Sequence, residues 1–560
     1  MNKTKIILYA LLGVVCFALW NAWQKDYPVA NTSLAEKQAL TSAAATTAAN
    51  ITPGITSTSI SANDSAQQNL TTKKQLSQIP ENRLIKVKTD VLDISIDPVG
   101  GNIARANLLQ YKKSLDGTEL VQLLSDNPEN LSLSESGLIS AIGPDLPTKQ
   151  ATYVTTKKNY ILNSNQNDLQ VALLWRGAKG LSVSKTFVFE KGSYDIKVNY
   201  DINNNGKQVW NGQFYAQLKN KYIPVSKSFF KYSSFSGFAI SSPDKPYQKF
   251  TYDKLNTEKI NVDIQGGWLA MQQPYFLSAW VPDKSKTLHY FSDVSSGDIY
   301  TSGFIDNNIS IPAGSSLALT SSLYVGPEII DNLNKVSPKL GLTVDYGWLW
   351  FISIALLWLM QQIYKVVGNW GVSIILVTVL IKLLFYKLSE SSYRSMAHMK
   401  DLAPKIKALK ERFADDKQKL NQAMMELYRK EKINPLGGCL PMVVQIPVFI
   451  GLYYVLIAAV ELRQAPFVFW IHDLSAKDPF YVLPILMGLT MFIQQRLSPP
   501  SPDPAQAKMM MMLPIVFTIF FISFPSGLVL YWLVNNILSV LQQWYINKKF
   551  TKNPPVKKHR

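Results

Sequence analysis

The stretch that decides the fold is residues 509–546, MMMMLPIVFTIFFISFPSGLVLYWLVNNILSVLQQWYI. It holds two apolar runs, 509–524 and 527–546, which are joined by Phe524-Pro525-Ser526-Gly527. Proline and glycine favour a tight turn. A membrane span needs about 20 apolar residues, or somewhat fewer where the bilayer is thinned. The stretch therefore predicts a helical hairpin of two short membrane spans with almost no loop between them.

Further apolar runs lie at 1–24, 348–367, 370–388, 441–460 and 480–496. At the N-terminus, Lys3 and Lys5 precede an apolar stretch, which is the pattern of a signal sequence. Bulky residues occupy the places where a cleavage site would need small ones, so we expect an uncleaved signal anchor over 1–24. A cleaved signal peptide is the alternative. Lipidation of Cys16 is disfavoured because Val15 precedes it.

Basic residues set the expected topology. The segment 391–433 and the tail 548–560 are rich in lysine and arginine, and such segments stay in the cytoplasm. The polar region after the anchor must then be periplasmic, so only one crossing separates it from residue 391. We assign 370–388 to that crossing and 348–367 to an amphipathic helix in the membrane interface. Six transmembrane helices result, with both termini cytoplasmic.

The segment 391–433 also has an apolar stripe, which predicts two antiparallel amphipathic helices. A solvated charged loop is the alternative. A basic helical hairpin suits recruitment of a ribosome, a targeting factor or an emerging chain. The stripe consists of Met399, Leu402, Ile406, Leu409, Phe413, Leu420, Met424 and Leu427, and the candidate recruitment residues are Arg394, Lys400, Lys405, Arg412 and Lys417.

The region before the core divides into a linker and a domain. Residues 25–80 are rich in small and polar residues and poor in aromatic ones, which predicts a disordered tether. Within 81–340 the hydrophobic pattern has a period of two. Ile196, Val198, Tyr200 and Ile202, for example, alternate with polar residues. This pattern predicts antiparallel strands and a large β-sandwich over about 84–325. Its most distinctive stretch is 266–276.

Polar residues inside the predicted spans are the candidate functional residues. Lys382 lies within the 370–388 span, with Thr378 one helical turn earlier. A lysine at mid-bilayer costs about 2.5 to 3.5 kcal/mol on insertion scales and usually marks a functional interior. The polar residues together predict a hydrated cavity, with snorkelling of Lys382 and hydrogen bonding between helices as alternatives. The other members are Gln445, Thr490, Gln494, Trp532, Asn535, Asn536, Ser539 and Gln542.

Several function classes are disfavoured. The net charge of +18 is explained by basic residues beside apolar runs, and anionic lipid and ribosomal RNA stay open as additional partners. No Asp, Glu or His lies inside a predicted span, which disfavours a proton-coupled transporter. There is no phosphate-binding loop motif, and Ser526 has no intramembrane histidine to activate it. Neither His289 nor the two cysteines form a recognisable motif. We therefore expect no enzyme, cofactor or metal.

Several long motifs resemble the YidC insertase family, in its Gram-negative form with a large periplasmic domain. The resemblance extends over nearly the whole chain and is strongest after residue 369. The motifs are Asn369-Trp370-Gly371, Asn434-Pro435-Leu436-Gly437-Gly438-Cys439, Glu461-Leu462-Arg463-Gln464-Ala465-Pro466, Trp470-Ile471-His472-Asp473-Leu474-Ser475, Phe524-Pro525-Ser526-Gly527-Leu528-Val529-Leu530-Tyr531, residues 266–276, and Tyr324-Val325-Gly326-Pro327.

The resemblance implies an inner-membrane protein with a periplasmic super-β-sandwich and a five-helix core within 370–547. The core would hold a groove open to the cytoplasm and to lipid. The family's groove arginine aligns with Lys382, and a family tyrosine aligns with Trp532, beside Tyr531. Lysine keeps the positive charge but loses the planar fork of arginine. The implied partners are nascent membrane proteins, the Sec translocon, and the ribosome or the signal recognition particle and its receptor.

From the residues alone, two other classes of function stay open. A channel or transporter would explain a polar interior. A membrane-anchored scaffold or glycan-binding protein would explain the sandwich, although it leaves Lys382 unexplained. Substrate-dependent flux in liposomes would favour the first of these. Function retained by residues 84–340 alone would favour the second.

Overall fold

The computed structural model describes residues 78–146, 149–224, 235–413, 416–431, 440–497 and 504–552, all within one structural unit, Pro53–Arg560. The predicted signal anchor 1–24 and the predicted linker up to residue 77 lie outside the described residues. Cys16, Cys439 and the last residues of the basic tail, 553–560, lie outside them as well.

Strand β9 (Asp195–Asn204) shows why the domain before the core forms sheets. Ile196, Val198, Tyr200 and Ile202 are all fully buried, and the polar residues between them face away from the core. In a strand, successive side chains point to opposite faces, so a period of two buries one whole face. The prediction of half-buried antiparallel strands is confirmed for this element.

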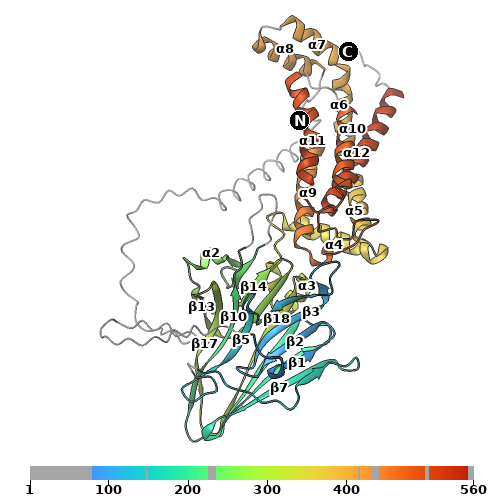
Figure 1. The fold of residues 1–560 in the computed structure, drawn as a ribbon. Helices are drawn as coiled ribbons and strands as arrows, with labels where there is room; N and C mark the ends of the chain where they lie inside the picture. Colours follow the sequence, from blue (N-terminus) through green and yellow to red (C-terminus); the bar gives the residue numbers. More distant parts are fainter. Residues whose placement is uncertain are drawn as a thin grey trace, which may run out of the picture. The chain divides into compact units, whose positions relative to one another are not determined.

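The strands form two sheets (Figure 1). One has the order β13-β16-β17-β10-β5-β3-β2-β1-β6, with β4 paired to β3, and the other has the order β12-β11-β14-β15-β18-β9-β8-β7. All strand pairs are antiparallel except β1 with β6. The bounds are β1 Ile85–Lys88, β2 Leu92–Asp97, β3 Asn102–Lys112, β4 Leu120–Leu124, β5 Ser132–Ile139, β6 Asn159–Ile161, β7 Asp168–Arg176, β8 Leu181–Glu190, β10 Trp210–Lys221, β11 Gly237–Ser241, β12 Gln248–Phe250, β13 Asn261–Gln265, β14 Trp268–Gln273, β15 Phe276–Val281, β16 Thr287–Ser295, β17 Ile299–Ile311 and β18 Ser315–Pro327.

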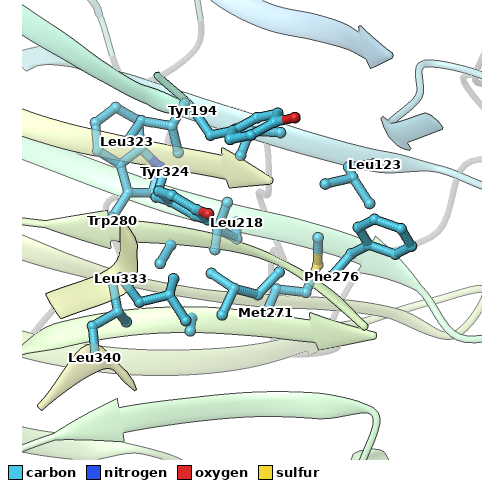
Figure 2. Packing of buried hydrophobic residues seen from close by; sticks show 14 of the residues in the cluster. Leu123, Tyr194, Leu218, Met271, Phe276, Trp280, Leu323, Tyr324, Leu333 and Leu340 are labelled. Carbon is cyan, nitrogen blue, oxygen red and sulfur yellow. The ribbon is translucent and has the colours of Figure 1, made fainter. Parts of the chain in front are cut away.

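The core of the domain lies between the two sheets. Figure 2 shows Leu218 of β10 and Leu123 of β4, from one sheet, in the same buried cluster as Met271, Trp280 and Leu323 from the other. Each of these side chains is at most 1% exposed. Burying apolar surface of this kind contributes about 25 cal/mol per Å². The core therefore follows directly from the alternating pattern on both sheets.

A buried polar cluster closes one end of this domain. Glu328, directly after β18, accepts a hydrogen bond from Gln272 Nε2 at 2.8 Å. Gln272 Nε2 also donates to the Thr343 carbonyl at 3.0 Å, and Tyr247 donates to Gln272 Oε1 at 2.7 Å. Burial raises the pKa of Glu328 to about 8. The cluster gives Gln272, in the distinctive stretch 266–276, a structural role where the sheets meet the segment that leads to the helices.

The remaining elements are helices. α2 and α3 are short, and α4 precedes a bundle made by α5, α6 and α9–α12, in which α12 packs against α5, α6, α9 and α10. The bounds are η1 Glu81–Arg83, η2 Ala178–Gly180, α2 Tyr252–Leu255, α3 Ile330–Val336, η3 Leu340–Thr343, α4 Trp350–Val367, α5 Trp370–Leu384, α6 Tyr386–Asp401, α7 Ala403–Arg412, α8 Lys417–Lys430, α9 Leu440–Ala458, η5 Val460–Leu462, α10 Val482–Leu497, α11 Pro504–Phe521 and α12 Ser526–Lys552.

Helix lengths give only partial information about membrane crossing. Among the described residues, α4 alone is a single helix long and apolar enough to span a bilayer, and α5 with the first part of α6 meets the criterion as a bent pair. Shorter apolar helices occupy 443–458, 482–497 and 508–521. The expectation of six crossings, with α4 in the interface, therefore stays a prediction.

Two predicted helical segments are divided in the structure, and a third helix extends beyond its predicted span. The predicted continuous span 370–388 bends by 67° between α5 and α6. The first arm of the basic hairpin is interrupted at Leu402, because α7 begins there with Pro404 in its first turn, and proline cannot continue the α6 hydrogen bonding. Helix α12 runs to Lys552, past the predicted end of the core at 547.

The basic hairpin itself forms where its apolar stripe predicts. α7 and α8 lie against each other beyond the end of α6 (Figure 1). Leu402, Ile406 and Tyr428 are buried in a small cluster of their own, with Met424 and Leu427 packed on it. Asp416 caps α8 by accepting from the backbone N–H groups of residues 418 and 419. Burial of Leu402 and Ile406, with Met424 and Leu427 packed on them, disfavours the alternative of a solvated loop.

Candidate functional site: a polar pocket in the helical core

The Asn369-Trp370-Gly371 motif fixes the start of α5. Gly368 ends α4 in the left-handed conformation, with φ of 65°. Asn369 then caps α5 by accepting from Val372 N at 3.0 Å, and its Nδ2 donates to the Phe467 carbonyl at 3.0 Å. A side chain at Gly371 would collide with the Phe467 ring. These three residues therefore allow α5 to start close to the loop that contains Phe467.

The Phe-Pro-Ser-Gly turn is held by another of the quoted motifs. Ser526 N donates to the Ala476 carbonyl at 2.7 Å, and Gly527 N donates to the Leu474 carbonyl at 2.9 Å. The Ser526 hydroxyl donates to the Asp473 carbonyl at 2.8 Å. These bonds satisfy backbone donors at the start of α12, where a helix has no partners of its own. The turn between α11 and α12 is thus tied to the segment 473–476.

The polar residues of α12 reach three different helices. Asn535 and Gln445 of α9 exchange two amide hydrogen bonds, of 3.0 and 3.2 Å. Asn536 Nδ2 contacts Thr490 Oγ1 of α10 at 3.5 Å. Ser539 accepts a hydrogen bond from Lys382 Nζ of α5 at 2.7 Å. For Asn535 and Asn536 the structure therefore favours the alternative of hydrogen bonds between helices.

A small pocket lies beside Lys382. It is lined by side chains from α5, α6 and α9 and contains both polar and apolar groups. Lys382 forms no ion pair with a carboxylate within the described part of the chain. The lining residues are Ile381, Lys382, Phe385, Leu388, Ser389, Val444 and Gln445.

Three other predicted groove residues, Thr378, Tyr531 and Trp532, lie outside the pocket. Thr378 is 1% exposed, and its hydroxyl donates to the Ile374 carbonyl of its own helix at 2.6 Å. Tyr531 is buried, whereas Trp532 is half-buried and packs edge-on against Phe449 at 4.8 Å between ring centroids. The indole Nε1 of Trp532 is buried without a hydrogen-bond partner among the described residues. The structure brings Lys382 and Gln445 to one pocket, and none of these three lines it.

Sequence reasoning missed the contribution of α6 to the pocket. Leu388 and Ser389 of α6 line it, together with Phe385 between α5 and α6, and Ser389 is 3% exposed. They reach it because of the bend between α5 and α6. No proline or glycine marks that bend, so the local sequence gives no signal for it.

The basic recruitment residues lie on α6, α7 and α8. Arg394 faces Glu390 at 3.6 Å, and Lys405 Nζ contacts Glu431 at 2.6 Å. Arg412 is exposed and lies over the Phe413 ring at 5.5 Å. Lys400 and Lys417 belong to α6 and α8, but their side chains lie outside the described part of the structure. Within the described residues, no three His, Cys, Asp or Glu side chains are grouped so that they could hold a metal ion.

Two family models match this chain and define its class of protein. The family model described as the YidC periplasmic domain matches residues 84–359, and the one described as 60Kd inner membrane protein matches residues 362–553. The chain is thus an inner-membrane protein with a periplasmic β-sandwich domain. It is 48% identical to the membrane protein insertase YidC of Coxiella burnetii, over 98% of this chain and 97% of the relative. It is 48% identical to that of Legionella pneumophila, over 100% and 99%.

This chain belongs to the YidC family of membrane protein insertases. Among solved structures, it is similar to a crystal structure of an active YidC insertase with its first transmembrane domain resolved. That likeness covers 84% of this chain and 94% of the other, with a TM-score of 0.38 and 16% identity. The assignment rests on the sequence matches.

Proposed function

We propose that this insertase accepts the polar segment of a client membrane protein at the pocket beside Lys382. The observation that carries the proposal is that, among the described residues, the ammonium group hydrogen-bonds only to a neutral hydroxyl, at 2.7 Å, beside a pocket that Gln445 and Ser389 also line. A cation held by a neutral acceptor keeps its charge available for an anion. An acidic client segment is the chemistry that fits.

The electrostatics of the pocket favour one carboxylate at a time. A charge pair at about 4 Å is worth about 1 kcal/mol in water and about 4 kcal/mol at an effective dielectric constant near 20. Lysine presents a point charge with three donors and, unlike arginine, no planar fork. We therefore expect attraction of an acidic segment without strict bidentate geometry. Such attraction lowers the cost of bringing the polar segment part of the way across the bilayer.

The apolar part of the client would move along the outer face of the core. Helix α11 exposes a continuous apolar surface, on which Met509 and Ile519 are 66% and 65% exposed. Methionine side chains adapt to many apolar partners. Partition of the client helix into lipid then supplies the driving force, at about 25 cal/mol per Å² of apolar surface buried. No nucleotide is required for this step.

In the proposed arrangement, α4 lies in the periplasmic interface of the membrane. Its Trp350 and Trp358 are 60% and 59% exposed, and tryptophan favours membrane interfaces. Ser353 donates to the Gly451 carbonyl of α9 at 3.1 Å, which ties α4 to the core. In this topology, α6–α8 lie on the cytoplasmic side of the helical core. Both termini are cytoplasmic. The basic helices would then face the ribosome, the signal recognition particle or its receptor, and anionic lipid, and some clients would arrive through the Sec translocon.

The test is complementation. The native protein is depleted, and insertion of a small client with an acidic tail is followed by protease protection with the unmodified chain, Lys382→Ala and Lys382→Arg. Lys387→Ala is the matched control, because Lys387 is exposed on α6 and does not line the pocket. We expect Lys382→Ala alone to fail at equal expression. Equal insertion by all four chains would refute the role of the charge, and failure of the unmodified chain with several clients would refute the proposed function.

A further inference from the structure

The hydroxyl of Ser539 contacts the ammonium group of Lys382. The side chain is 3% exposed and comes from α12, whereas Lys382 comes from α5. Lys382 Nζ donates to Ser539 Oγ at 2.7 Å. This is the length of a strong, charge-assisted hydrogen bond.

The orientation of this hydroxyl is set by its own helix. Ser539 Oγ donates to the Asn535 carbonyl, one turn earlier, at 2.7 Å. A serine hydroxyl has one proton and two acceptor lone pairs. With the proton directed at Asn535, only lone pairs face Lys382. Ser539 thus joins Lys382 of α5 to the backbone of α12 through one oxygen.

A long lysine side chain in an apolar segment tends to extend its ammonium group towards the nearest water. A fixed acceptor opposes this tendency by holding one of the three ammonium protons. The other two protons stay available to the pocket that Lys382 lines with Gln445 and Ser389. Without the acceptor, the ammonium group would keep its charge, but no hydrogen bond would hold it at the pocket.

We propose that Ser539 is a positioning residue, which holds the Lys382 ammonium at the pocket so that an acidic client segment meets it there. The inference rests on the proposed function and deepens it, since it names the residue through which the charge acts. Ser539 does not itself need to touch the client.

The experiment compares Ser539→Thr with Ser539→Val in the full-length chain. Threonine and valine have nearly the same shape, so both place the same extra bulk at this buried position, and only threonine keeps the hydroxyl. We expect Ser539→Val to reduce insertion of an acidic-tailed client about tenfold, consistent with about 1.5 kcal/mol for a hydrogen bond to a charged group. Ser539→Thr should retain most of the activity.

Each variant is also tested with a client whose polar segment carries no acidic residue. If Ser539 acts by positioning the Lys382 ammonium, valine and threonine at 539 give equal insertion of this client, because it has no carboxylate for the ammonium to meet. A purely structural role would instead give the same loss with both clients, and that result would overturn the inference while the proposed function stands. If Lys382→Ala alone has no effect on insertion, the role of the groove charge is overturned, and the inference with it.

Discussion

The amide pair between Gln445 and Asn535 leads to a sharp prediction about the stability of the helical core. The two side chains exchange two hydrogen bonds, of 3.0 and 3.2 Å, between α9 and α12. Hydrogen bonds between membrane helices average about 0.6 kcal/mol and reach about 1.7 kcal/mol. The pair should therefore contribute about 1 to 3 kcal/mol to the free energy of unfolding.

The perturbation is a double-mutant cycle with Gln445→Leu, Asn535→Leu and the double variant. Each single variant leaves one amide unpaired and should cost about 1 to 3 kcal/mol. The double variant removes both polar groups, so the second leucine should cost much less than the first. The expected coupling energy is about 1 to 2 kcal/mol.

The assay is unfolding by SDS in mixed micelles, followed through a fluorescent probe on a cysteine introduced at Ile537, which is 42% exposed on α12. Cys16 and Cys439 are replaced by serine so that the probe is unique. The matched control pairs Gln445→Leu with Asn536→Leu, because Asn536 contacts Thr490 instead. If the losses of unfolding free energy from Gln445→Leu and Asn535→Leu simply add in the double variant, the reasoning is refuted. An equal coupling energy between Gln445→Leu and Asn536→Leu would refute it as well.

Three further predictions concern other parts of the molecule. Burial raises the pKa of Glu328 to about 8. Its contribution to stability is therefore present below about pH 4.5, near the ordinary pKa of a glutamate, and is lost as the pH rises towards 8. The free energy of opening of β14 and β18 in the full-length protein should therefore fall by about 1.4 kcal/mol per pH unit over this range. Hydrogen exchange, corrected for intrinsic rates, measures this free energy. Glu328→Gln should remove the pH dependence. Leu323 is fully buried between the sheets, so Leu323→Ala should lower the opening free energy by about 2 to 5 kcal/mol in the same exchange measurement. A loss no larger than that from replacing an exposed leucine by alanine would contradict the described core. Gly527→Ala should destabilise the core by about 1 to 3 kcal/mol in the SDS assay, because a Cβ there would lie 2.8 Å from a Leu456 methyl group and 3.1 Å from the Leu474 carbonyl; an unchanged midpoint would contradict that packing.

Much of the candidate site could be predicted because its residues are unusual for their surroundings. A lysine and a row of amides inside apolar runs are costly unless they have partners, so their presence alone marks an interior. The partners themselves could not be predicted. Asn535, Asn536 and Ser539 belong to one stripe in the sequence, yet they reach α9, α10 and α5. The helical period gives the face of a residue, and only the packing of the neighbouring helices gives its partner.

Local errors in the prediction have the same origin. The bend between α5 and α6 has no proline or glycine at it, and it brings Ser389 into the pocket. The break before α7 does have its signal, Pro404, which sits in the first turn of the new helix. Thr378 lies on a predicted polar face, but its hydroxyl bonds to its own helix. A polar side chain in a helix can satisfy itself locally, and the sequence does not distinguish that outcome from an open site.

The sequence by itself determined which segments are apolar, which are basic and which alternate with a period of two, because these patterns follow from burial and backbone geometry alone. It therefore predicted the β-sandwich, the helical core and the basic hairpin. Only the tertiary structure decided that the ammonium of Lys382 rests on Ser539, that Gln445 pairs with Asn535, and that the α6 bend closes the pocket. Each of these depends on contacts between residues far apart in the chain, whose geometry is fixed by packing and leaves no periodic trace in the sequence.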